Sequence, residues 1–187
     1  MPDTAYRRTI PGFGEVRIRS LDPAGDAPLV HSWVTQDRAR FWGMRDHTVE
    51  QVADIYAYVD SLPSHFAWLV LHDDAPVALF QTYRPEHDPV GECYEVRPGD
   101  HGVHLLIGPV AGAARPGYTA VLVGVFLGFV FADPGHLRIV AEPDARNDKA
   151  IARLRRTGFT PGPQIDLPDK RAQLMFIDRT AAAGLLI

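Results

Sequence analysis

A histidine and a glutamate stand where a sheet can bring them together. His104 lies in an apolar segment, residues 103–107, that predicts a central strand, and Glu142 follows a second apolar segment, residues 137–141. Histidine exchanges protons near neutral pH, so His104 is either a general base or a buried histidine hydrogen-bonded within its strand. Glu142 either orients His104 or binds a substrate group, or it pairs with Arg138, which shares its strand face by parity.

Other reactive side chains show no comparable arrangement. His101 has the opposite strand parity from His104 and is expected to be structural or to lie at the rim of a site. Cys93 lies in a loop-like segment, and nothing near it in the sequence activates its thiol. His65 and His72 lie apart on the two arms of a predicted hairpin without a cysteine or carboxylate cluster, so we expect no metal site.

A loop of small residues leads from the first of these strands into a long apolar helix. The strand ends at Gly108-Pro109, residues 110–114 are small, and Arg115-Pro116-Gly117 precedes the helix. Backbone N–H groups at a helix N-terminus bind phosphate, glycine allows close approach, and Arg115 adds a charged donor. Asn147 opens the helix after the second strand, where its side chain either caps that helix or meets a ligand amide. The residues alone leave a phosphate site and a plain loop both open.

Hydrophobic periodicity and turn residues predict an α/β fold in which helices alternate with strands. Thr48 and Gln51 have the spacing of a capping box at the start of one helix. A long polar loop with three prolines is expected over residues 84–100. The expected strands are residues 15–19, 66–71, 77–83, 103–107, 137–141, 159–165 and 172–177, and the expected helices are residues 26–38, 48–62, 117–131 and 148–157.

Length, composition and charge exclude several classes of protein. The chain of 187 residues is expected to form one domain, residues 1–187, with 46% hydrophobic and 22% charged residues as in ordinary globular proteins. Its net charge of -4 argues against a nucleic-acid partner. A single cysteine excludes an internal disulfide and, with an N-terminus that lacks an apolar signal core, favours the cytoplasm. The longest apolar run, residues 119–132, is shorter than the ~20 residues of a membrane span, so no membrane association is expected.

Four ordered segments resemble the siderophore-biosynthesis branch of the GNAT acyltransferases, which acylate N-hydroxylated lysine or ornithine side chains. The resemblance covers nearly the whole chain from about His31. The segments are HSWVTQDRARFWGM from His31, YRPEHDPVGECYEVRPGDHGVHLLIGP from Tyr83, AEPDARN from Ala141 and LPDKRAQLMFIDR from Leu167.

The chain departs from the GNAT pattern at two places. The segment before the long helix is similar to the pyrophosphate loop Gln/Arg-x-x-Gly-x-Gly/Ala, with Gly117 at the first glycine and Thr119 at the second small position. Ala114 stands at the leading basic position, and Arg115 follows one residue late. Leu154 stands where many members carry a tyrosine proposed as the acid for the leaving thiolate, so that role is not carried over.

The resemblance implies a fold, a donor and an acceptor. The fold is a single α/β GNAT domain whose mixed central sheet is splayed between two central strands and flanked by helices. Acetyl-CoA is the implied donor and a small N-hydroxylated amine the acceptor, with direct transfer, no metal, His104 as base and Glu142 beside it. The implied acyl-CoA contacts are Ile107, Arg115, Gly117, Tyr118, Thr119 and Asn147. The implied acceptor contacts are His31, Trp33, Phe41, Trp42, Tyr83 and Asp88.

Some of these residues have a second interpretation, and two other functions stay open. Trp33, Phe41 and Trp42 are also expected as core aromatics, and Asp88 as a solvated turn residue. Lys170 matches a family position without a chemical role. The alternatives are an aminoglycoside 6'-N-acetyltransferase, which shares the tryptophan-rich N-terminal segment, and a catalytically silent acyl-CoA-binding module, which fits the altered glycine loop. The sequence does not decide the acceptor's length, the acyl group or the oligomeric state.

Overall fold

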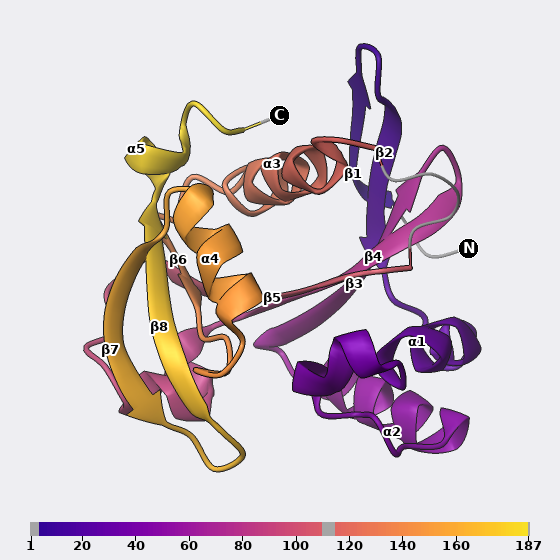
Figure 1. Ribbon diagram of the computed structural model, residues 1–187, viewed down its shortest axis with the longest axis horizontal. Coiled ribbons are helices and arrows are strands. Elements are labelled where there is room, and N and C mark those ends of the chain that lie inside the picture. Colours follow the sequence, from indigo (N-terminus) through magenta and orange to yellow (C-terminus); the bar gives the residue numbers. More distant parts are fainter. Residues whose placement is uncertain (1–3, 110–114, 187) are drawn as a thin grey trace. The chain divides into compact units, whose positions relative to one another are not determined.

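The computed structural model describes residues 4–109 and 115–186, where strands alternate with helices (Figure 1). Within this part of the chain eight strands form one sheet in the order β1-β2-β3-β4-β5-β6-β8-β7, which confirms the predicted α/β fold. The strands are β1 (Thr4–Ile10), β2 (Gly14–Ser20), β3 (His65–His72), β4 (Ala75–Tyr83), β5 (Asp100–Ile107), β6 (Arg138–Ala141), β7 (Thr160–Asp166) and β8 (Arg171–Asp178). The helices are α1 (Ala27–Val34), α2 (Val49–Ser61), α3 (Tyr118–Val130), α4 (Asp148–Arg156) and α5 (Arg179–Ala182), with 3-10 helices η1 (Asp37–Trp42), η2 (Pro85–His87) and η3 (Pro89–Glu92).

The chain packs as two compact units. The first consists of Met1–Gln81 with Leu105–Tyr118, and the second of Thr82–His104 with Thr119–Ile187. In the second unit β6 runs parallel to β5 and antiparallel to β8, so the sheet is mixed as expected. The single domain over residues 1–187 and the splay between two central strands stay predictions.

The core of the first unit is built around α1 and α2, which lie side by side (Figure 1). The predicted capping box starts α2: Thr48 Oγ1 accepts from the Gln51 amide at 3.3 Å, and Gln51 Oε1 accepts from the Thr48 amide at 2.8 Å. These bonds satisfy two donors that a helix start leaves unpaired. Val52 and Tyr56 then fall one helical turn apart on the buried face, so local sequence determines both the start of α2 and its orientation.

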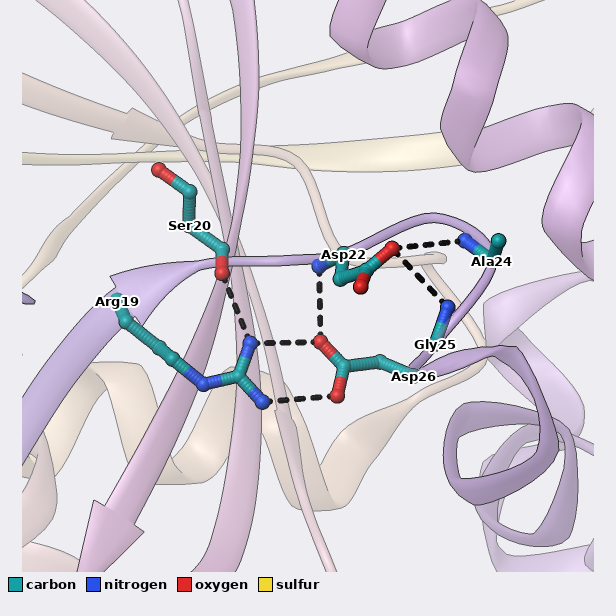
Figure 2. A network of polar contacts seen from close by, with 6 residues as sticks. All are labelled: Arg19, Ser20, Asp22, Ala24, Gly25 and Asp26. Carbon is teal, nitrogen blue, oxygen red and sulfur yellow. Dashed lines mark hydrogen bonds and ion pairs between the residues drawn. The ribbon is translucent and has the colours of Figure 1, made fainter. Parts of the chain in front are cut away.

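An ion pair fixes the connection from β2 to α1 (Figure 2). The guanidinium of Arg19 donates to both carboxylate oxygens of Asp26, at 2.7 and 2.8 Å, and to the carbonyl oxygen of Ser20. The Asp22 amide donates to the same carboxylate at 2.8 Å. Burial raises the pKa of Asp26, but the Arg19 guanidinium and this amide hold it below its ordinary value. The carboxylate therefore stays charged and holds the first turn of α1 against the end of β2.

The first strand was not predicted from the sequence. β1 pairs antiparallel with β2, as in Thr9↔Glu15, but its side chains are exposed or half-buried throughout. A strand without a buried face carries no apolar alternation, which is the signal that sequence reading requires. β1 forms because its backbone pairs with β2, and not because of a pattern in its own sequence.

The helix predicted over residues 26–38 is wrong in length. α1 ends at Val34, and a separate 3-10 helix, η1, follows at Asp37. Gln36 has an extended backbone, and the Thr35 hydroxyl donates to the His31 carbonyl at 2.8 Å. The two β-branched residues before Gln36 weaken the helix, and this hydroxyl bond replaces its continuation.

The guanidinium group of Arg179 binds the segment that follows α3. The guanidinium of Arg179 donates to the carbonyl oxygens of Phe131 at 2.8 Å and His136 at 3.0 Å, and to that of Asp133. These carbonyl groups belong to residues that follow α3, which ends at Val130, so the guanidinium connects that segment to the end of β8. Among the residues described, no helix has the length and apolar character that crossing a membrane requires.

His101 gives the fold a specific sensitivity to acid. The buried side chain stacks on His136, with ring centroids 3.8 Å apart. Burial first, and then the charge of His136, lower the pKa of His101 from 6.5 to about 4; Arg84 acts in the same direction and Asp133 opposes it. Between these two pH values the unfolded chain binds a proton at this residue and the folded chain does not. Stability is therefore lost as the pH falls through this window.

We expect the free energy of unfolding to drop by up to about 3 kcal/mol over this window. Urea denaturation across the same pH range measures the drop. His101→Gln removes the titrating group and is expected to flatten the pH dependence, whereas His87→Gln, at an exposed loop histidine, leaves it as in the wild type. Parallel curves for the wild type and His101→Gln would contradict the assignment.

Candidate functional site

The ladder between β5 and β6 ends just before the two residues that could do chemistry. The parallel pairing runs from Asp100↔Arg138 to Gly102↔Val140. His104 and Glu142 each lie two residues beyond that last pair. Because strand side chains alternate with a period of two, both leave the sheet on the same face. The backbone therefore places these two side chains together.

The imidazole and the carboxylate are in direct contact. His104 Nε2 contacts Glu142 Oε1, and 34% of the His104 side chain is exposed against 4% of Glu142. An ionised carboxylate only accepts hydrogen bonds, so Nε2 carries the hydrogen and the lone pair of the neutral ring lies on Nδ1. The arrangement is a buried anion behind a partly exposed imidazole.

Three groups keep Glu142 charged. Tyr83 donates its hydroxyl hydrogen to Oε2 at 2.7 Å, and Lys170 Nζ lies 3.7 Å from Oε1, the oxygen that His104 also contacts. Burial would raise the pKa of Glu142, but His104 first, then Lys170 and Tyr83, bring it below the ordinary value. Burial and the adjacent carboxylate raise the pKa of Tyr83, so the phenol remains a donor. Glu142 is accordingly an anion at neutral pH.

Tyr83, expected at the acceptor, is found behind Glu142. Only 1% of it is exposed, and its ring packs against Gly102. Contact between Tyr83 and an acceptor stays a prediction; what the structure shows is a donor to the carboxylate.

The alternative pairing of Glu142 with Arg138 is not observed. Arg138 binds Asp100 through two hydrogen bonds of 2.7 and 2.6 Å, and Tyr94 donates to the same carboxylate at 3.0 Å. Arg138 also lies over the Phe176 ring, 4.6 Å from its centroid. Because Arg138 binds Asp100, Glu142 pairs with His104 and not with Arg138.

Among the predicted acyl-CoA residues of the first unit, Arg115, Gly117 and Tyr118 lie at the start of α3. Ile107 ends β5, and its carbonyl oxygen accepts from Arg38 at 2.6 Å. The Tyr118 hydroxyl meets His72 Nδ1 at 3.0 Å, and the Tyr118 amide donates to the Arg115 carbonyl at 3.2 Å. The side chain of Tyr118 thus anchors the helix start to a hairpin.

Glycine suits the backbone before α3. Gly117 has a φ of +80°, a conformation that L side chains rarely adopt, and no atom of the described residues lies within 4 Å of the position of a Cβ. The predicted loop of small residues, 110–114, with Ala114 at the basic position, lies outside the described residues. The phosphate site that includes Arg115, Gly117 and Thr119, the second residue of α3, stays a prediction.

Asn147 acts as a helix cap. Its Oδ1 accepts from the Ala150 amide at 3.2 Å at the start of α4. This is the capping role that the sequence left open beside a ligand contact. A ligand contact of Asn147 stays a prediction.

The aromatic residues predicted for the acceptor wall lie mainly in the core of the first unit. Trp33 is 4% exposed and packs against Gly108, and Trp42 packs on the same core while its Nε1 donates to the Tyr56 hydroxyl at 3.2 Å. The core interpretation thus describes both tryptophans. His31 Nε2 meets the carbonyl oxygen of His47 at 3.0 Å, and the Arg40 guanidinium covers the Phe41 ring at 4.7 Å.

An acidic hollow of about 500 Å³ lies in the long loop that follows β4. Asp88 lines it, although one of its carboxylate oxygens already accepts from the Val90 amide at 3.0 Å. The other lining residues are Glu86, His87, Pro89, Gly91, Glu92 and Val96. Three of the lining residues are carboxylates, and a contact of Asp88 with an acceptor stays a prediction. Neither in this hollow nor in the rest of the described chain are three His, Cys, Asp or Glu side chains grouped so that they could hold a metal ion.

Lys170 joins the site although sequence reasoning gave it no role. It lies in the turn between β7 and β8 and reaches Glu142, 28 positions away in the sequence. One available signal was its rarity, since the chain has only two lysines, Lys149 and Lys170. Its partner, however, is set by tertiary packing and is not visible in a local pattern.

Comparison with known proteins identifies relatives and a shared fold. Residues 22–167 match the family described as acetyltransferase (GNAT) domain. The chain is 28% identical over 176 residues to the N(6)-hydroxylysine O-acetyltransferase of Escherichia coli, covering 93% of this chain and 56% of that protein. It is 26% identical over 167 residues to lysine N-acyltransferase MbtK of Mycobacterium sp. (strain MCS), covering 88% and 68%. The aminoglycoside acetyltransferase AAC(6')-Ib, solved in complex with coenzyme A, has the same fold, with a TM-score of 0.77, 24% identity and coverage of 90% and 98%.

The chain spans about half the length of the curated relatives that it matches first.

Proposed function

The chain belongs to the acetyltransferase (GNAT) family, and we propose that it transfers an acyl group from acetyl-CoA to the nitrogen of an N-hydroxylated lysine- or ornithine-type side chain. The observation that carries this proposal is the contact between His104 and the buried anion Glu142. The product is a hydroxamate, a group that chelates iron(III), so we place the reaction in siderophore biosynthesis. We place it in the cytoplasm, where Cys93 stays reduced.

The names of two relatives support the acceptor class. One is an N(6)-hydroxylysine O-acetyltransferase and the other a lysine N-acyltransferase. The first name puts the acyl group on oxygen and the second on nitrogen. A hydroxylamine carries both atoms, so the position of the acyl group in the product is part of the test.

The proposed reaction uses His104 as a base. The acceptor nitrogen attacks the thioester carbonyl and forms the C–N bond, its proton passes to Nδ1 of His104, and the C–S bond breaks to release coenzyme A. Glu142 stabilises the imidazolium that forms, because its carboxylate contacts Nε2. An N-hydroxylated amine is less basic than an amine, so a larger fraction is uncharged near neutral pH and a weak base suffices. Leu154 cannot protonate the thiolate, and no residue is assigned that role.

The acidic hollow supplies a place for the charged end of the acceptor. Asp88, Glu86 and Glu92 line it. An amino acid acceptor carries an α-ammonium group, which these carboxylates attract. We therefore assign Asp88 and its neighbours to that group, at the far end of the acceptor from the reacting nitrogen.

Acceptor preference tests the proposal. Acetyl-CoA turnover is followed as release of free thiol with N6-hydroxylysine, N5-hydroxyornithine, lysine and kanamycin as acceptors. We expect a clear preference for the hydroxylated amines, and the product is expected to form a coloured complex with iron(III), as a hydroxamate does and an O-acyl hydroxylamine does not.

Each other result identifies another function. The acidic hollow also suits a polycation, so preference for kanamycin would favour an aminoglycoside 6'-N-acetyltransferase. Coenzyme A binding without turnover of any acceptor would favour a silent acyl-CoA-binding module.

A further inference from the structure

The side chain of Lys170 is largely buried, although the residue lies in a turn whose flanking side chains are exposed. The turn joins β7 to β8 and is closed by a hydrogen bond of 2.8 Å from the Leu167 amide to the Lys170 carbonyl. The side chains of Asp166 and Arg171, which flank the turn, are 89% and 67% exposed, whereas that of Lys170 is 19% exposed. Lysine is rarely buried unless it is paired, so a specific partner holds it there.

Its partner is the buried carboxylate of the proposed site. Lys170 Nζ lies 3.7 Å from Oε1 of Glu142, the oxygen that His104 Nε2 also contacts. One carboxylate oxygen therefore faces two groups of potential positive charge. Lysine is a permanent cation near neutral pH, whereas the imidazole takes up and releases a proton.

The positions of Lys170 and His104 at one oxygen of Glu142 influence whether the His104–Glu142 pair carries a proton on the imidazole. A carboxylate beside an imidazole favours the imidazolium, which cannot accept another proton. A second cation at the same carboxylate oxygen offsets that attraction. Lys170 also keeps Glu142 charged without a proton from His104, because it stabilises the anion in a site where burial opposes charge.

We infer that Lys170 is a positioning residue for the proposed acyl transfer: its ammonium group holds Glu142 as an anion and keeps His104 neutral, so that Nδ1 is able to accept a proton. The inference rests on the proposed function for its consequence in catalysis, but the charge relation among the three residues is testable without any acceptor. Other charged or titratable groups nearby are the Asp144–Arg146 pair, the Tyr83 phenol and Asp88.

The test removes the charge and then restores it. Lys170→Met keeps the length of the side chain without its charge, Lys170→Arg keeps a cation, and Lys149→Met makes the same charge change at an exposed residue of α4. In Lys170→Met the His104–Glu142 pair is expected to hold its proton to higher pH. The midpoint of the His104 NMR titration should rise by about one pH unit, which corresponds to about a tenfold change in proton affinity. His104→Ala identifies the resonance.

The same variants give a kinetic result. The acid limb of the kcat/KM profile is expected to move to higher pH with the titration midpoint, so that activity falls about tenfold on that limb and recovers at higher pH. Lys170→Arg and Lys149→Met are expected to behave as the wild type.

Failure of the inference and failure of the proposed function are distinguishable. An unchanged titration midpoint in Lys170→Met overturns the inference, whether the variant melts earlier, as a structural lysine would make it, or loses turnover at every pH, as a substrate contact would. A shifted midpoint in a protein that acylates none of the acceptors supports the charge relation and overturns the proposed function alone.

Discussion

Replacing His104 by alanine is expected to lower kcat/KM for the hydroxylated acceptor by about 10²–10⁴-fold, the usual contribution of a positioned general base. The residue is suited to this role because Glu142 fixes one ring nitrogen and directs the lone pair to the other. The fold should survive the change. Glu142 keeps its hydrogen bond from Tyr83 and its ion pair with Lys170, so the variant leaves no unpaired buried charge.

The measurement compares turnover with binding. Acetyl-CoA affinity, measured by calorimetry, and the melting temperature are expected to stay near those of the wild type in His104→Ala. His65→Ala is the matched control, because His65, at the start of β3, belongs neither to the proposed site nor to the lining of the acidic hollow. Turnover near the wild-type level in His104→Ala would show that the histidine is structural.

Strand periodicity predicted the strands that carry His104 and Glu142, whereas the roles of these two residues in catalysis stay predictions that rest on the family resemblance. The apolar segments 103–107 and 137–141 correctly indicated two strands, which the structure pairs in parallel, and parity correctly separated His104 from His101, which stacks on His136 instead. Such information is local, because a residue's position in a strand determines the face from which its side chain leaves. The capping box at Thr48 was predictable for the same reason.

Tertiary partners were not predictable in this way. Strand parity predicted that Arg138 could pair with Glu142, yet Arg138 pairs with Asp100. The cation beside Glu142 is Lys170, which lies in a turn far away in the sequence. Trp33 was expected either in the core or at the acceptor, and the packing of α1, α2 and the sheet places it in the core. Local pattern indicates which face a residue occupies, and the choice among partners on that face depends on elements far away in the sequence.

Gly102→Ala is expected to damage both the fold and the site, although it adds a single methyl group. A Cβ at Gly102 would lie within 3.0 Å of three carbons of the Tyr83 ring, closer than real Cβ atoms come to other atoms. The Gly102 backbone does not require glycine, so the cost is steric. Overpacking of this kind costs about 1–3 kcal/mol, measured by urea denaturation. We expect the displaced ring to draw its hydroxyl away from Glu142, and a displacement of ~1 Å in a site lowers kcat/KM by about 10²-fold.

The cause can be isolated with a second substitution in the same contact. Tyr83→Leu removes the ring carbons that meet the new methyl group, so in the double variant Gly102→Ala should cost much less stability than it does alone. Tyr83→Phe removes only the hydroxyl, leaves the clash in place and should not relieve it. Gly184→Ala is the matched control, because no atom in the described part of the chain lies within 4 Å of its Cβ position, and its stability should remain within about 0.5 kcal/mol of the wild type. Strictly additive effects of Gly102→Ala and Tyr83→Leu would show that the added methyl group does not meet the ring, and strong coupling would show that it displaces the ring whose hydroxyl donates to Glu142.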